Sequence, residues 1–128
     1  PNSYILIMDS PDVIRKKIAR AVTDSIGVIN YTEEQPGVKN LIDIICAIEN
    51  VTPDEVVARY VGKGYADLKK DTAEVIINEL APIQEKFNEL MSDKKALEAI
   101  YKEGAEKANY VSMKLLRKMQ KKIGLIPR

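Results

Sequence analysis

The feature that most constrains the fold of this 128-residue chain is a run of apolar residues spaced with the period of an α-helix. Successive members are three or four positions apart: Ala73, Ile76, Leu80, Ile83, Phe87 and Leu90. This spacing places them on one face of a helix that packs against other helices. Pro82 lies inside the run, where it removes one backbone hydrogen bond. We therefore expect it to kink the helix rather than end it.

Capping residues and apolar runs predict four more helices. A cap followed by proline predicts helices over residues 11–24 and 53–60. The apolar run 41–48 is hydrophobic nearly all round its helix, which indicates a central buried element. Loops are expected over residues 25–37, which include the pair Pro36-Gly37, and again at 62–65.

The last helix is predicted to start after a cap at Ser92-Asp93 and to stop at Gly124 and Pro127. Its expected inner stripe is Leu97, Ile100, Gly104, Ala108, Val111, Leu115, Met119 and Ile123. With a short extended segment at Asn2–Met8, the pattern predicts one all-α domain, a helical bundle of about five helices.

The residue inventory disfavours a free-standing enzyme. There is no histidine and a single cysteine, Cys46, which removes the usual general base, the usual zinc ligands and any internal disulfide. Cys46 lies in the apolar run and is expected to pack as a small hydrophobe. The sequence therefore predicts no catalytic residue and no metal site in this chain.

Charge is unevenly distributed, although the net charge is only +1. Ten acids and six bases lie between Asp67 and Glu106. After that point there are only bases: Lys107, Lys114, Arg117, Lys118, Lys121, Lys122 and Arg128. Complementing a helix dipole needs only one or two of them, so the basic end is either a surface for a phosphate backbone or a solvated face.

The segment Gly62–Lys70 is a second candidate for binding an anion. Two glycines allow close approach of a ligand, a helix N-terminus offers N–H groups, and Tyr65 can stack on a base. The spacing is not that of a nucleotide P-loop. The alternative is a connector between helices whose tyrosine packs on the core.

Five ordered blocks resemble bacterial tryptophanyl-tRNA synthetases, in the part that follows their Lys-Met-Ser-Lys-Ser loop. The blocks are Pro11–Ile18 continuing through Ala21–Ser25, Pro36-Gly37-Val38 with Asn40-Leu41, Gly62–Tyr65 with Asp67 and Lys69-Lys70, Pro82–Glu85, and Gly104–Ala108. The resemblance runs from about Pro1 to Gly124. The catalytic loop and the nucleotide-binding domain of that family are missing from this sequence.

The resemblance implies a fragment of a class I aminoacyl-tRNA synthetase. Residues 1–10 correspond to the segment after the catalytic loop, and residues 11–128 to the C-terminal helical domain that holds the anticodon. ATP, with Mg²⁺, is implied for the parent enzyme and no cofactor for this chain. The implied partners are tRNA(Trp) and the parent catalytic domain. The parent is expected to be a homodimer, whereas this fragment is expected to be a monomer. The expected location is the cytoplasm, with no membrane as a partner.

The resulting hypothesis is that two basic surfaces contact the tRNA. The predicted contacts are Lys63, Tyr65, Lys69 and Lys70 on one surface and Lys114, Arg117, Lys118, Lys121 and Lys122 on the other. Tyr65 or Tyr110 would stack on single-stranded bases while the lysines position the backbone. The alternative is a helical protein-interaction module that uses the Ile76–Leu90 seam or the basic helix.

Overall fold

The structure, a computed structural model, describes residues 4–125, which contain five helices and no strand. They are α1 (Pro11–Ala19), α2 (Pro36–Glu49), α3 (Pro53–Arg59), α4 (Tyr65–Ser92) and α5 (Lys94–Lys122). The chain divides into two compact units, Pro1–Glu85 and Lys86–Arg128. The prediction of an all-α fold with five helices is confirmed.

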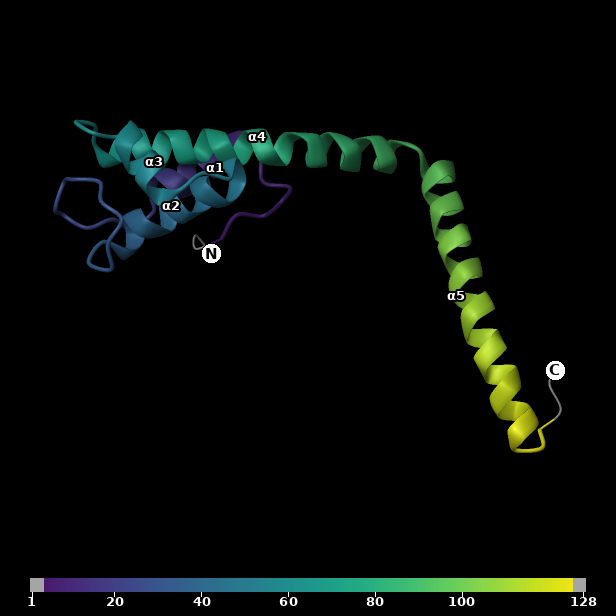
Figure 1. The fold of residues 1–128 in the computed structure, drawn as a ribbon. Coiled ribbons are helices and arrows are strands. Elements are labelled where there is room, and N and C mark those ends of the chain that lie inside the picture. Colours follow the sequence, from purple (N-terminus) through teal and green to yellow (C-terminus); the bar gives the residue numbers. More distant parts are fainter. Residues whose placement is uncertain (1–3, 126–128) are drawn as a thin grey trace. The chain divides into compact units, whose positions relative to one another are not determined.

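The hydrophobic core lies in the first unit, where α1, α2 and α3 gather along the first part of α4 (Figure 1). Its buried side chains are Ile14, Ile18, Ile29, Val38, Leu41, Ile42, Ile45, Val56, Tyr60, Leu68, Ala73 and Ile76. Cys46 packs against this cluster, and burial raises the pKa of its thiol. The prediction that Cys46 packs as a small hydrophobe is confirmed.

Two predicted boundaries were wrong. The helix predicted to reach residue 24 ends at Ala19. Ala21 donates its N–H to the Ile18 carbonyl, and the Lys69 ammonium binds the Ala21 carbonyl at 2.7 Å, so the chain leaves the helix there. Pro36-Gly37 is not a turn but the start of α2, because proline at the first helical position has no N–H to leave unpaired.

The caps of α3 and α5 agree with the sequence. Thr52 forms a complete capping box with Glu55 at the start of α3. Asp93 accepts a hydrogen bond from the Ala96 N–H at 3.0 Å and so begins α5. The helix α4 continues through Pro82, as predicted. Gly124, with φ of +77°, follows the end of α5, whereas Pro127 lies outside the described residues.

The N-terminal segment forms a turn within its described part, residues 4–10. The Leu6 N–H binds the Asp9 carboxylate at 2.9 Å, and the Asp9 N–H binds the Leu6 carbonyl at 3.0 Å. Gln84 of α4 then donates to the Ile7 carbonyl at 2.7 Å and to the Asp9 carbonyl at 3.0 Å. Side-chain hydrogen bonds therefore attach this segment to α4.

The apolar seam of α4 is buried only in its first half. Ala73 and Ile76 are in the core, whereas Ile83 and Phe87 are 47% and 45% exposed. The expected inner stripe of α5 was wrong, because α5 has no buried residue. Within the described residues, the unit that contains α5 holds only one other helical part, the last turns of α4. These turns are too short to cover an apolar stripe that runs the length of α5.

Candidate nucleic-acid interface

The predicted segment Gly62–Lys70 forms the entry into α4. The Lys63 ammonium lies 5.3 Å from the centre of the Tyr60 ring, a cation–π contact. The Gly64 N–H binds the Asp67 carboxylate at 3.2 Å. One of the N–H groups that this helix start was expected to offer to an anion therefore already has an acceptor in the same segment.

Tyr65 is held inside the fold by its hydroxyl group. The hydroxyl donates to the Asp24 carboxylate and accepts from the Gln35 side-chain amide at 2.9 Å and from the Gly27 N–H at 3.0 Å. Burial raises the pKa of Tyr65, and the hydrogen bond from Tyr65 lowers the pKa of Asp24. Tyr65 also packs against the hydrophobic core, as the alternative interpretation of this segment proposed.

Gln35 is the central residue of this network and was missed by the sequence analysis. It is 1% exposed, and its amide nitrogen donates to the Val28 carbonyl at 2.8 Å and to the Asp24 carboxylate at 3.2 Å. Its amide oxygen accepts from the Asn30 N–H at 3.1 Å. Gln35 therefore fixes the connection between α1 and α2. In the sequence, Gln35 is only a polar residue before Pro36, and nothing there indicates that it is buried and hydrogen-bonded in this way.

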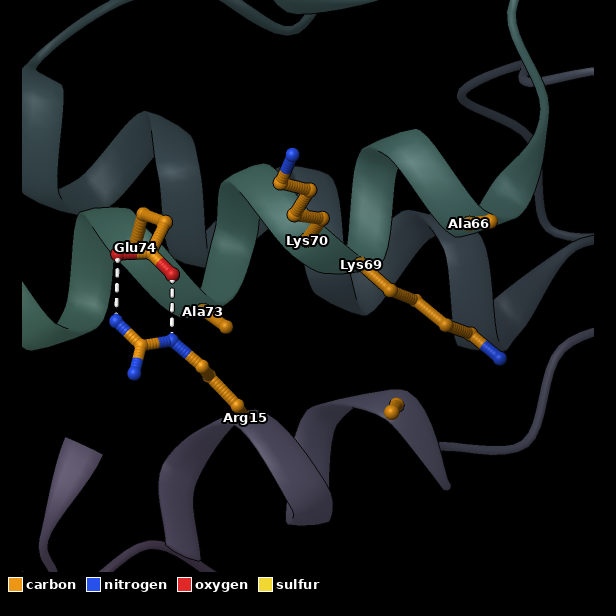
Figure 2. A pocket seen from close by; sticks show the side chains of 7 residues that line it. Arg15, Ala66, Lys69, Lys70, Ala73 and Glu74 are labelled. Carbon is orange, nitrogen blue, oxygen red and sulfur yellow. Dashed lines mark hydrogen bonds and ion pairs between the residues drawn. The ribbon is translucent and has the colours of Figure 1, made fainter. Parts of the chain in front are cut away.

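A groove of about 460 Å³ lies between α1 and α4 (Figure 2). It is lined by Arg15, Ala19, Ala66, Lys69, Lys70, Ala73 and Glu74. Two predicted residues, Lys69 and Lys70, are brought together here, and Arg15 joins them from α1. The three alanines leave space between the charged side chains, so the groove combines an apolar surface with an excess of positive charge.

Arg15 bridges the groove by pairing with Glu74. Its Nε lies 2.7 Å from one carboxylate oxygen and its Nη2 lies 3.2 Å from the other. Figure 2 shows both contacts, with the guanidinium reaching from α1 to the carboxylate on α4. The hydrogen bond from Arg15 lowers the pKa of Glu74, and the same bond raises the pKa of Arg15. The carboxylate thus fixes the plane of the guanidinium.

The two lysines of the groove differ in what they bind. The Lys69 ammonium is part-buried and donates to the Ala21 carbonyl at 2.7 Å. Lys70 is exposed, and no carboxylate of the described residues forms a salt bridge with it. In Figure 2 the two amino groups point in different directions. Of the two lysines, Lys70 is therefore the one whose ammonium group is less engaged by other residues of the chain.

The second predicted surface belongs to α5 in the other unit. Its five basic residues, Lys114, Arg117, Lys118, Lys121 and Lys122, are all exposed. Within residues 4–125, none of them forms a salt bridge. Tyr110, on the same helix, is 74% exposed. The end of α5 is a basic surface that also carries exposed apolar side chains.

Across residues 4–125, no group of three or more histidine, cysteine or acidic side chains is placed to hold a metal ion. None of the helices in this range is both long and apolar enough to cross a membrane.

Comparisons with known proteins place the chain among the aminoacyl-tRNA synthetases. The model of the family "tRNA synthetases class I (W and Y)" matches residues 1–81. A tryptophan–tRNA ligase of Clostridium perfringens is 73% identical over 128 residues, which is 100% of this chain and 39% of that protein. A tryptophan–tRNA ligase of Bacillus subtilis is 44% identical over 96% of this chain and 37% of that protein.

A solved structure agrees with these matches. The crystal structure of tryptophanyl-tRNA synthetase from Mycoplasma pneumoniae superposes with a TM-score of 0.73 at 27% identity. The match covers 98% of this chain and 38% of that one. The chain thus spans less than two fifths of the length of the relatives it matches, and its resemblance to tryptophanyl-tRNA synthetases is confirmed. The chain belongs to the family of class I tRNA synthetases (W and Y).

Proposed function

We propose that this chain is the tRNA-binding segment of a tryptophan–tRNA ligase and holds the anticodon end of tRNA(Trp). The observation that carries the proposal is the 73% identity to such a ligase over all 128 residues. The exposed bases on α5 and beside α4 supply the positive charge that binding to a phosphate backbone requires.

The chemistry of the longer ligase is part of the same proposal. That enzyme would activate tryptophan with ATP and Mg²⁺ and transfer it to the tRNA, in the cytoplasm and as a homodimer. In this proposal ATP and Mg²⁺ belong to the parent catalytic domain, and this chain holds no cofactor. By itself the present chain would be catalytically inactive.

The proposed contacts remain the two predicted basic surfaces. Lys63, Lys69 and Lys70 would position the RNA backbone near the start of α4. The five bases at the end of α5 would contact phosphates in the same way. Tyr110 is the better candidate for base stacking, because its ring is exposed whereas Tyr65 packs on the core and binds Asp24.

Charge reversal on α5 tests this proposal in the intact ligase. The variant Lys118→Glu/Lys121→Glu removes two bases from the end of α5. Its matched control, Lys94→Glu/Lys95→Glu, makes the same charge change at the start of the same helix. We expect weaker tRNA binding and a shallower salt dependence only for the first variant, because each lost phosphate contact lowers the slope by about 0.7–0.9. Unchanged affinity and unchanged slope would exclude the end of α5 from the interface.

A helical protein-interaction module is the second candidate. The observation that favours it is the exposed apolar stripe of α5, where Val111, Leu115 and Met119 are each more than half exposed. A protein partner would cover this stripe. Binding that is independent of RNA, and lost on changing Leu115 to Asp, would support this candidate.

A further inference from the structure

We propose that the groove between α1 and α4 takes one unstacked nucleotide of the bound RNA, with its base between the helices and its phosphate near Lys70. This inference rests on the proposed function and names the part of the RNA that the groove would hold.

The groove has the dimensions and surface of a small-molecule site. Its volume of about 460 Å³ falls within the roughly 300–1,000 Å³ typical of ligand pockets. Ala19, Ala66 and Ala73 contribute only methyl groups, so a flat ring can lie close to both helices. Single-stranded RNA presents such rings, because its bases can leave the stack and enter protein pockets.

Arg15 supplies a flat surface at one end of the groove. Its guanidinium binds both oxygens of Glu74 and, through Nη1, Asp12 at 3.2 Å. With two carboxylates beside it, this cation is largely neutralised and is poorly suited to hold a phosphate. A guanidinium plane held in this way is instead suited to stacking against a base.

Lys70 and Lys69 supply the positive charge for the phosphate. The lining holds three bases and one acid, and that acid is paired with Arg15. The excess charge therefore comes from the two lysines. Lys69 already binds the Ala21 carbonyl, so Lys70 is the main phosphate contact. The lining of the groove thus combines a guanidinium paired with carboxylates and a lysine that forms no salt bridge within residues 4–125, groups suited to the base and to the phosphate of a nucleotide.

The first test fills the groove in the intact protein. The variant Ala19→Leu/Ala66→Leu places larger side chains at two exposed groove positions, and the control Ala47→Leu/Ala58→Leu does so at exposed positions outside it. We expect the groove variant to weaken tRNA binding by roughly five- to a hundred-fold, the range for loss of one stacked base, with the salt slope unchanged. The control should bind like the wild type.

The second test examines the phosphate contact and the base contact separately, the first with a lysine variant and the second with a crosslink. Lys70→Ala should weaken binding and lower the salt slope by about 0.7, the value for one phosphate of a single strand. A tRNA carrying 4-thiouridine in its anticodon loop should crosslink to a peptide containing Arg15 or Ala66, and the groove variant should abolish this crosslink.

The outcomes distinguish the groove from the proposed function. Wild-type protein that binds tRNA(Trp) no better than an unrelated tRNA would overturn the proposed function itself. Wild-type protein that binds specifically, while the groove variant binds and crosslinks equally well, would overturn only the nucleotide site. An unchanged salt slope for Lys70→Ala would overturn its phosphate contact.

Discussion

Arg15 of α1 and Glu74 of α4, which are 59 positions apart in the sequence, form a two-point ion pair through the guanidinium Nε and Nη2. The pair joins α1 to the first half of α4, which carries the buried residues of that helix. It also borders the groove that the two helices enclose. This one ion pair therefore both connects the two helices and forms part of the wall of a candidate binding groove.

The pair makes stability depend on pH in the acid range. The hydrogen bond from Arg15 lowers the pKa of Glu74 from its ordinary 4.5. A lowered carboxyl pKa contributes stability above the unfolded-state value, and this contribution is lost as pH falls through the folded value. We expect Glu74→Gln to show a smaller loss of stability than the wild type between about pH 5 and pH 3. Urea unfolding followed by circular dichroism at several pH values measures this, and equal losses would contradict it.

Gly37 is required by the close approach of the chain at Val22. A Cβ at position 37 would overlap the Val22 carbonyl oxygen, which is backbone and has little freedom to move. We expect Gly37→Ala to lower the free energy of unfolding by about 1–3 kcal/mol, as for other overpacked sites. Gly64→Ala is the matched control, because no atom lies within 4 Å of its added Cβ. Equal effects of the two changes in denaturant titrations would refute this explanation.

The cap of α3 offers a test of local structure. The Thr52 hydroxyl accepts from the Glu55 N–H, and the Glu55 carboxylate accepts from the Thr52 N–H at 2.8 Å. We expect Thr52→Ala to lower the free energy of unfolding by about 0.5–2 kcal/mol. Ser10 occupies the same position before α1 but makes no side-chain cap, so Ser10→Ala should have a smaller effect. Thermal unfolding of both variants compares them, and a larger loss for Ser10→Ala would count against the argument.

The two units should differ in local stability. The helix α2 buries Val38, Leu41, Ile42 and Ile45, whereas α5 has no buried residue. Because local opening is opposed mainly by buried contacts, amides of α5 should exchange with solvent faster than those of α2. Hydrogen exchange followed by mass spectrometry on the 128-residue chain tests this. Slower exchange in α5 than in α2 would show that α5 has a partner within the chain.

Much of the fold follows from local sequence signals. Proline after a cap correctly marked the starts of α1 and α3, and the periodic seam correctly predicted α4. These signals act over one or two helical turns, so they are readable without knowing the rest of the fold. The resemblance to tryptophanyl-tRNA synthetases was likewise carried by short blocks in order.

The remaining features depend on contacts between distant residues. Nothing near Gln35 indicates that it would join Asp24 to Tyr65, and nothing near Arg15 indicates Glu74 as its partner. The groove between α1 and α4 was missed for the same reason, although Lys69 and Lys70 were singled out. Periodicity showed which face of α5 is apolar but not whether another helix covers it.

The most direct test of the central claim is tRNA binding by the 128-residue chain over a series of salt concentrations. Filter binding or fluorescence anisotropy would compare tRNA(Trp) with an unrelated tRNA. We predict tighter binding of tRNA(Trp) at every salt concentration, with an affinity that falls as salt rises because phosphate contacts release counterions. Equal affinity for the two tRNAs would contradict the account, since it would leave only general binding to polyanions.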